Sequence, residues 1–372
     1  MMLRNKLTLA ILAIGLSNQV MALDLGEYNG TKFSIGGYIK AEAIYDMPEK
    51  NGEDTWQTSA RQSRINVATE KQVNDIKLKG YIEVDFWDDS AEAGDSTYAP
   101  RIRHAYIGIN NFTIGQTWAG QFFGNAPFDV NMVNFYGPGT GSIAGNGAVI
   151  RPDMVVSWNK NLGNGHSVRL TGQDPVWQYA NIPDLVASYN FRTGGHAFNL
   201  TATGREVGTE IGSGVNAGDD PDESKYGAAI SAAAKLKFGG TTLAFSAYTG
   251  KGAGVYAGWG RRAGGTGPNQ DTDVDTNGKL ITTTGLTAGI TQQLTNKLSA
   301  TLRYGQVEAD LKGMSEDTIK MTNVNLVYNY LPEVDFGIEW RDQNVGTRPP
   351  TSLTTSSRPE GQQVELFAMY KF

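Results

Sequence analysis

The sequence of 372 residues contains no cysteine and only three histidines. Without cysteine, the chain can form no disulfide framework, no thiolate metal site and no thiol nucleophile. It also lacks any block of basic residues, and its formal net charge is −6. Nucleic acid is therefore not an expected partner, because binding to phosphates needs a basic surface.

Long hydrophobic runs are missing as well, and the one apolar run lies near the start of the chain. Arg4 and Lys6 precede the apolar residues 7–16, and Val20-Met21-Ala22 follows as a small-residue cleavage site. The alternative, an uncleaved membrane anchor, would need about 20 apolar residues. We predict a secretory signal peptide over residues 1–22 and an exported mature chain over residues 23–372.

What the sequence does contain is alternation of apolar and polar residues. The segment IKLKGYIEVDFW, residues 76–87, places Ile76 and Leu78 on one face and Lys77 and Lys79 on the other, which is the period of a β-strand. The average hydropathy of such a chain resembles that of a soluble protein, because the two faces cancel. Composition leaves two classes open, a secreted all-β protein and an outer-membrane β-barrel.

Sixteen segments share this alternation and decide between the two classes. They span residues 32–46, 58–70, 76–87, 101–109, 112–118, 154–160, 166–173, 184–191, 196–204, 223–238, 241–250, 280–291, 298–309, 318–330, 334–341 and 362–372. Short, turn-rich connections alternate with long ones, as in transmembrane barrels and unlike soluble sandwiches. The sequence predicts an all-β fold, a 16-stranded antiparallel transmembrane β-barrel over residues 23–372, whose last strand pairs with its first.

Basic residues recur on the strand face that should line a water-filled channel. RIRHAYIG places Arg101 and Arg103 two residues apart on one face, with His104 on the opposite face. The candidate pore-lining residues are Arg64, Lys77, Lys79, Arg101, Arg103, Arg151 and Arg169. Guanidinium groups hold carboxylates in bidentate fashion, so such a wall favours small anionic solutes. The alternative is an ordinary solvated polar wall.

The longest connection follows the fifth segment and runs for more than 30 residues. Loops of this length in a compact architecture are usually functional. We expect it to fold into the barrel and to narrow it, and the alternative is a lid on the surface. The residues expected at the constriction are Asp129, Asn131, Asn134 and Tyr136.

The sequence contains few residues that could support metal binding or catalysis. Asp273, Asp275 and Asn277 match the first positions of a calcium loop, but Thr284 stands where a bidentate Glu belongs, so they are only a weak Ca²⁺ candidate. With His104 expected on the face opposite the arginine pair, a nucleophile and base pair is hard to assemble there. No cofactor and no catalytic residue are expected.

The motifs that carry these features resemble the Gram-negative trimeric porins, and most closely the DcaP-like porins. The matching stretches are GYIKAEAIYD, SRINVATE, YIEVDFW, RIRHAYIG followed by FTIGQTW, and the terminal aromatic. The resemblance implies a homotrimer in the bacterial outer membrane, a third long loop that constricts each pore, and passive uptake of small acids such as dicarboxylates. It also implies that Arg64, Arg101 and Arg103 contact anions in the pore.

The end of the chain fits the same resemblance. The alternating strand that carries Tyr370 and ends in Phe372 is similar to the signal that the barrel-assembly machinery reads in outer-membrane proteins. Phe372 is expected at the interface of the outer-membrane lipids. Some family members carry a longer stalk before the barrel, whereas about ten residues separate Ala22 from Phe33 here, so no coiled-coil extension is expected.

Three functions remain as hypotheses. The first is a diffusion channel that favours small anionic solutes, with selectivity set by pore width and by the basic wall. The second is a barrel enzyme, which would need an inward His, Ser and carboxylate within hydrogen-bond reach. The third is a surface adhesin or receptor, in which the long loops would bind and the lumen would be blocked.

Overall fold

The computed structural model describes the chain in twelve ranges. They are residues 22–49, 53–86, 99–121, 128–130, 132–133, 151–175, 180–208, 223–257, 273–274, 278–310, 317–344 and 361–372. The predicted signal peptide lies outside these residues, apart from Ala22, and stays a prediction. No helix within the described ranges is long and apolar enough to cross a membrane.

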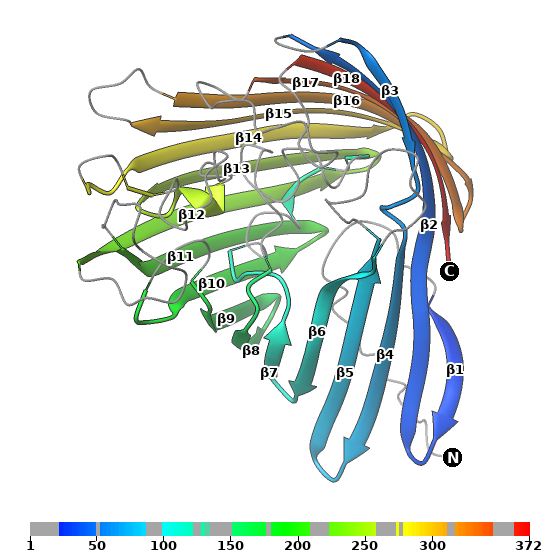
Figure 1. The fold of residues 1–372 in the computed structure, drawn as a ribbon. Coiled ribbons are helices and arrows are strands. Elements are labelled where there is room, and N and C mark those ends of the chain that lie inside the picture. The colour runs from blue at the N-terminus through cyan, green and yellow to red at the C-terminus, as the bar shows by residue number, and fades with distance from the viewer. Residues whose placement is uncertain are drawn as a thin grey trace.

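Most described residues lie in strands of one sheet (Figure 1). The strands are β1 Leu23–Tyr28, β2 Thr31–Pro48, β3 Thr55–Ser59, β4 Arg64–Val73, β5 Ile76–Asp85, β6 Arg101–Ile109, β7 Phe112–Gln116, β8 Val155–Gly163, β9 His166–Gln173, β10 Asp184–Thr193, β11 His196–Gly208, β12 Ser224–Phe238, β13 Thr241–Lys251, β14 Thr282–Gln293, β15 Leu298–Asp310, β16 Asp317–Leu331, β17 Val334–Asn344 and β18 Gly361–Lys371. One short 3-10 helix, η2, spans Gly254–Ala257.

The sheet closes on itself, as the alternation predicts. β18 pairs antiparallel with β2 from Gly361 opposite Pro48 to Lys371 opposite Tyr38, so no edge is left open there to the lipid. β3 and β4 both pair with the same edge of β2 and act as one interrupted strand. In the described residues the barrel therefore has sixteen strands, and the predicted fold class is confirmed.

Two details of the first strands differ from the prediction. The segment predicted as one strand over 58–70 is broken at residues 60–63, where the Ser63 hydroxyl accepts the backbone N–H of Lys40 at 3.1 Å. The additional strand β1 pairs with β2 from Leu23 opposite Ile35 to Tyr28 opposite Thr31. β1 and β18 thus lie end to end along one edge of β2, as Figure 1 shows on its right-hand side.

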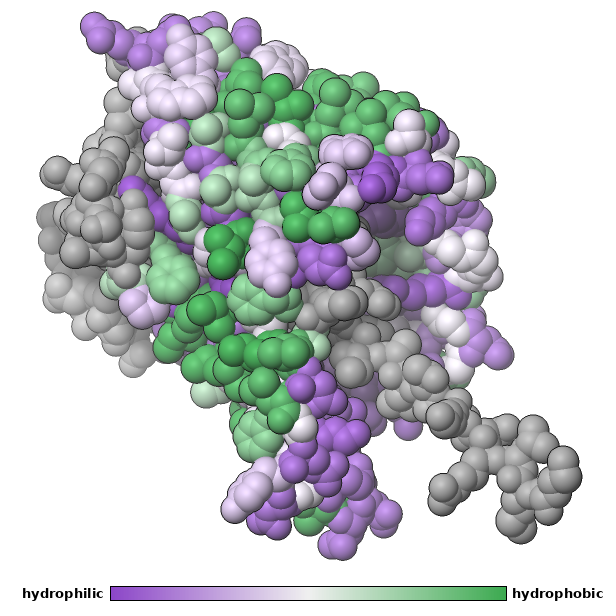
Figure 2. Space-filling model, turned by 90° about the vertical axis from the view of Figure 1, so that its right-hand side faces the viewer, coloured by the Kyte–Doolittle hydropathy of each residue, from purple (hydrophilic) through white to green (hydrophobic). Residues whose placement is uncertain are grey.

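Side chains alternate between an apolar outer wall and a polar inner wall. Outward-facing residues such as Leu185 and Leu200 are exposed by 59% and 48%, whereas the inward-facing Thr201 and Arg303 are buried. Figure 2 shows apolar side chains gathered across the outer wall, with hydrophilic side chains toward its upper and lower ends. This is the arrangement that a lipid-facing belt requires.

The short turns explain why neighbouring strands keep their register. Asn164 and Gly165 between β8 and β9 have φ angles of 52° and 84°, the left-handed pair that a type I′ hairpin needs. Gly194 and Gly195 repeat the pair between β10 and β11. All seven predicted short connections join antiparallel neighbours, and the predicted sorting of short and long connections is confirmed.

Gly165 provides a test of this turn chemistry, with Gly163 as its matched control. Both have positive φ, but a Cβ on Gly165 would lie 2.0 Å from the Arg192 carbonyl oxygen, whereas a Cβ on Gly163 meets nothing within 4 Å. We expect Gly163→Ala to cost about 1–2 kcal/mol of barrel stability from the left-handed backbone alone. Gly165→Ala should cost on the order of 4 kcal/mol, because overlap adds to strain. Urea unfolding of the protein in liposomes measures both losses. Equal losses would contradict the close approach of Gly165 to Arg192.

Candidate functional site

A group of charged side chains lies on β4, β5 and β6 and on the segments that flank β7 and β8. We call Arg64, Arg101, Arg103 and Arg151 the arginine cluster, because they are linked through Glu83, Asp85 and Trp118. The guanidinium groups of Arg103 and Arg151 lie 5.4 and 5.1 Å from the ring centre of Trp118. Guanidinium groups stack well on aromatic faces, so the tryptophan holds two like charges close together.

Two carboxylates of β5 hold the cluster in place. Asp85 accepts two hydrogen bonds from Arg101, at 3.0 and 2.9 Å, and a third from Arg103 at 2.8 Å. Glu83 accepts a hydrogen bond from Arg103 Nε at 2.9 Å and lies 3.7 Å from Arg64. The predicted Arg101 and Arg103 pair is thus brought together, but it is braced by acids that come from the same wall.

The position of His104 corrects the prediction. His104 is buried on the same inner face as Arg103, not on the opposite one, because the register of β5 against β6 shifts between Glu83 and Val84. The extra residue of such a bulge reverses the side-chain alternation. His104 Nδ1 lies 3.1 Å from the hydroxyl of Thr117, and its ring meets Trp118 edge-on at 4.9 Å.

The remaining basic residues of the predicted wall lie elsewhere. Lys77 sits beside the turn between β4 and β5 and pairs with Glu70 at 3.2 Å with both side chains partly exposed. The Lys79 ammonium lies 5.5 Å from the ring of Tyr81. Arg169 on β9 donates from Nε to Asn159 of β8. The basic residues therefore do not form one continuous ladder.

Exposure separates the members of the cluster. The side chain of Arg101 is 33% exposed, whereas its partner Asp85 is completely buried. The exposed charge of this pair is therefore the positive one. Among the described residues, Glu83 and Asp85 pair with three of the four guanidinium groups, those of Arg64, Arg101 and Arg103.

The described part of the long segment after β7 contacts the opposite side of the inner wall. The carboxylate of Asp129 accepts from Arg303 Nε at 3.0 and 2.8 Å, and its carbonyl oxygen accepts from Lys235 at 2.7 Å. Val130 packs over Gly289, where a Cβ would lie 2.7 Å from its side chain. Asn131, Asn134 and Tyr136, also predicted for the constriction, lie outside the described residues.

Lys40 is a residue that sequence reasoning did not single out. Its ammonium group is buried and lies 2.8 Å from Glu365 of β18 and 3.1 Å from Glu42 of β2. It also donates to the carbonyl oxygen of Val133 at 3.0 Å, while the N–H of Val133 donates to Glu339 at 2.9 Å. One cation thus joins the closing pair of strands to the long segment. The sequence indicates a role for Lys40 only through its position on the inward face of the alternating segment GYIKAEAIYD.

The weak calcium candidate has another use in this structure. The two carboxylate oxygens of Asp273 accept from Arg205 at 2.9 Å and from the N–H of Gly254 at 2.5 Å. Asp275 and Asn277 lie outside the described residues. Among the described residues, no group of three or more His, Asp or Glu side chains could hold a metal ion.

A closed sixteen-stranded barrel with short turns at one end, long connections at the other and charges along its inner wall defines a channel of the porin class. The sequence profile described as DcaP outer membrane protein matches residues 27–343. The chain belongs to this family, and it is a protein of the bacterial outer membrane. The resemblance drawn from the sequence motifs is confirmed.

Solved structures agree with this assignment of the fold. The outer-membrane channel DcaP of Acinetobacter baumannii superposes with a TM-score of 0.71 at 19% identity, covering 93% of this chain and 99% of that chain. The trimer form of OmpT from Vibrio cholerae gives 0.64 at 14% identity over 92% and 100%. An anion-selective porin from Comamonas acidovorans gives 0.62 at 12% over 92% and 100%. No curated protein sequence matches the chain significantly.

Proposed function

We propose that the protein is a passive diffusion channel that prefers small anionic solutes, with dicarboxylates as the expected class. The observation that supports the preference is the arginine cluster, in which the side chain of Arg101 is 33% exposed while its partner Asp85 is buried. A solute that passes this wall would meet these positive charges in a confined channel with low-dielectric walls. A planar guanidinium that is one-third exposed can contact a carboxylate in transit.

The long segment after β7 is proposed to narrow the channel. Its described residues Asp129 and Val133 contact inward-facing side chains on β2, β12, β15 and β17. In strand order, the arginine cluster on β4 to β6 lies across the barrel from the Asp129 contacts on β12 and β15, whereas the Val133 contact on β2 is next to β4. Solutes would then pass between the docked segment and the basic wall, close to the charges that select them.

A homotrimer is proposed for the assembled channel. The support is the likeness of the fold to a porin solved as a trimer, OmpT of Vibrio cholerae. Size-exclusion chromatography with light scattering in detergent tests this assembly, and a monomer at all concentrations would contradict it.

The anion preference is tested by reversal potentials of single channels in a potassium chloride gradient. We expect the native channel to favour chloride and Arg101→Ala to lower the ratio of anion to cation permeability about threefold. This follows because a unit charge ~7 Å from a passing ion contributes ~0.6 kcal/mol in water. The preferred solute class is then checked by competition, with succinate expected to block chloride current more strongly in the native channel than in Arg101→Ala.

Lys77→Ala is the matched control for this experiment. It also removes one positive charge, but from an exposed pair beside the short turns, where solvent screens it. Its permeability ratio should stay close to that of the native channel. Cation preference in the native channel would refute the anion proposal, and an equal effect of the two variants would remove the role of the cluster.

A further inference from the structure

The inner wall of the barrel carries an apolar patch that a water-filled channel does not require. Val307 and Ala309 of β15 and Ile319 of β16 all face inward, and each has an exposed fraction of 0%. Inner walls of open barrels are polar, because water contacts them. Something must therefore cover these side chains.

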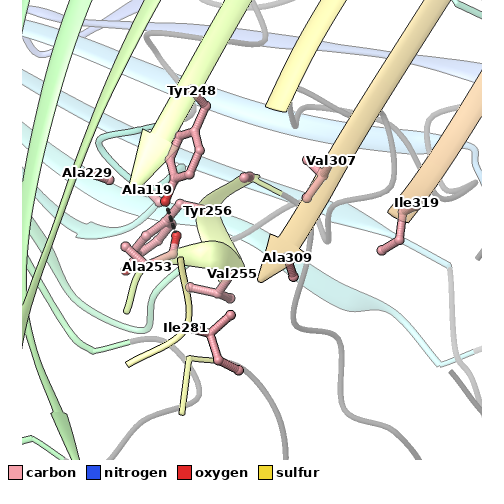
Figure 3. Close-up of a cluster of buried hydrophobic side chains, with 11 residues drawn as sticks. Ala119, Ala229, Tyr248, Ala253, Val255, Tyr256, Ile281, Val307, Ala309 and Ile319 are labelled. Atoms are coloured by element: carbon pink, nitrogen blue, oxygen red, sulfur yellow. Dashed lines mark hydrogen bonds between the residues drawn. The ribbon is translucent and has the colours of Figure 1, made fainter. Parts of the chain in front are cut away.

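The cover is a short piece of chain that follows β13. We call residues 252–257, which include η2, the internal segment. Figure 3 shows Val255 and Tyr256 of this segment beside Tyr248, Val307 and Ala309 of the barrel wall. Val255 and Tyr256 are exposed by only 1% and 4%. The hydroxyl of Tyr248 donates to the carbonyl oxygen of Ala253, which ties the segment to its own strand.

Polar contacts lock the segment in one place. The Tyr256 hydroxyl donates to Asp184 of β10 and accepts from Gln173 of β9 at 2.9 Å. The guanidinium of Arg205 lies 5.1 Å from the Tyr256 ring and pairs with Asp184 at 3.4 Å. Burial raises the pKa of Tyr256 well above its usual value, so the hydroxyl stays protonated as a donor.

Asp273 adds a fifth residue to these polar contacts and connects the internal segment to the chain that leads into β14. Asp273 accepts from Arg205 at 2.9 Å and from the N–H of Gly254 at 2.5 Å. Its carbonyl oxygen accepts the N–H of Ile281, whose own carbonyl accepts the N–H of Gly252 at 2.9 Å. The start of the internal segment is thus held by a backbone bond from Gly252, and Gly254 is held by the Asp273 side chain.

The internal segment also shares an anchor with the long segment after β7. Gln173 accepts the N–H of Gly120 at 2.7 Å and donates to Gln121 at 3.2 Å, besides its bond to Tyr256. Ala119 belongs to the same apolar cluster as Tyr256. The two segments that enter the barrel therefore meet at one buried glutamine.

We propose that the internal segment is a second fixed constriction, which sets the size limit for solutes through Tyr256 and its contacts with Asp184, Arg205 and Gln173. The inference rests on the channel function but not on the anion preference. It makes Tyr256 a positioning residue: it holds the segment against the wall on β9 to β11, and it braces the start of the long segment through Gln173.

The test compares Tyr256→Ala with the native channel in two ways. Single-channel conductance should rise, and in liposome swelling the rate for a neutral trisaccharide relative to a monosaccharide should rise severalfold. Neutral sugars report size without charge. The matched control is Tyr226→Ala, which removes an outward tyrosine exposed by 74% on β12 and should change neither quantity.

The absence of cysteine supplies an independent readout of docking. With Val255→Cys, a water-soluble thiol reagent should react slowly in the otherwise native chain and rapidly when Tyr256→Ala is added. Should Tyr256→Ala fail to assemble, Tyr256→Phe keeps the ring over Arg205 and loses only the hydroxyl bonds, and it should shift both quantities in the same direction by less.

Rapid labelling of Val255→Cys in the native background would refute docking itself. Labelling that becomes rapid while conductance and sugar ratio stay native would show that the segment moves but does not limit passage, which overturns the proposal. A native channel that conducts with no anion preference would refute the proposed selectivity and leave this inference standing, whereas no conductance at all would refute both.

Discussion

Lys40→Met should both weaken the barrel and enlarge the channel. The substitution leaves Glu42 and Glu365 buried without the cation that lies between them, at 3.1 and 2.8 Å. Removing one partner of a buried ion pair costs about 3–5 kcal/mol. The carbonyl of Val133 also loses its donor, so the long segment should detach from the wall and single-channel conductance should rise.

Two comparisons make this result specific. Lys77→Met removes a lysine from an exposed pair and should cost roughly 0–1 kcal/mol. Adding Glu365→Gln to Lys40→Met should recover part of the lost stability, because it removes one of the uncompensated charges. Urea unfolding in liposomes, followed by tryptophan fluorescence, measures all three. A loss in Lys40→Met no larger than that in Lys77→Met would contradict the role of the network.

Deletion of Phe372 should reduce the amount of protein in the outer membrane far more than it changes the conductance of the channels that form. Phe372 and Gly37 exchange two backbone hydrogen bonds, at 3.0 and 3.2 Å, at the point where β18 ends and β1 begins along β2. Without them, backbone groups on this edge of β2 lose their partners, and such groups cost several kcal/mol each where lipid excludes water. The arginine cluster is on other strands, so permeation should stay nearly native.

Phe372→Tyr is the control for this deletion. It keeps the backbone bonds to Gly37 and the aromatic ring beside Tyr370, 6.0 Å away. Surface labelling of intact cells gives the amount, and planar bilayers give the conductance. Native surface levels of the deletion variant would refute a role in assembly.

The order of the strands could be predicted well because its cause is local. Alternation with a period of two repeats within each strand, and turn residues such as Asn164-Gly165 mark where each hairpin reverses. The break at residues 60–63 and the strand β1 were missed. The break involves a hydrogen bond between Ser63 and Lys40 of the neighbouring strand. β1 forms on the part of the β2 edge that β18 does not cover.

The functional site was only partly predictable. The parity of Arg101 and Arg103 was correct, but that of His104 was wrong, because a bulge depends on how β5 pairs with β6. The charges looked like a basic wall, yet Asp85 and Glu83 neutralise part of it. Ion pairs of this kind join side chains from different strands, and no period in the sequence reveals them.

The sequence by itself determined that this chain forms sixteen antiparallel strands with one polar face, because period and turn chemistry are properties of neighbouring residues. Only the tertiary structure decided which charges face the channel. Lys40 meets Glu365 across 325 positions of the chain, and Asp129 meets Arg303 across 174. Such contacts arise when strands far apart in the sequence close the ring and loops fold against its inner wall, and electrostatic energy depends on the distances and the local dielectric that result.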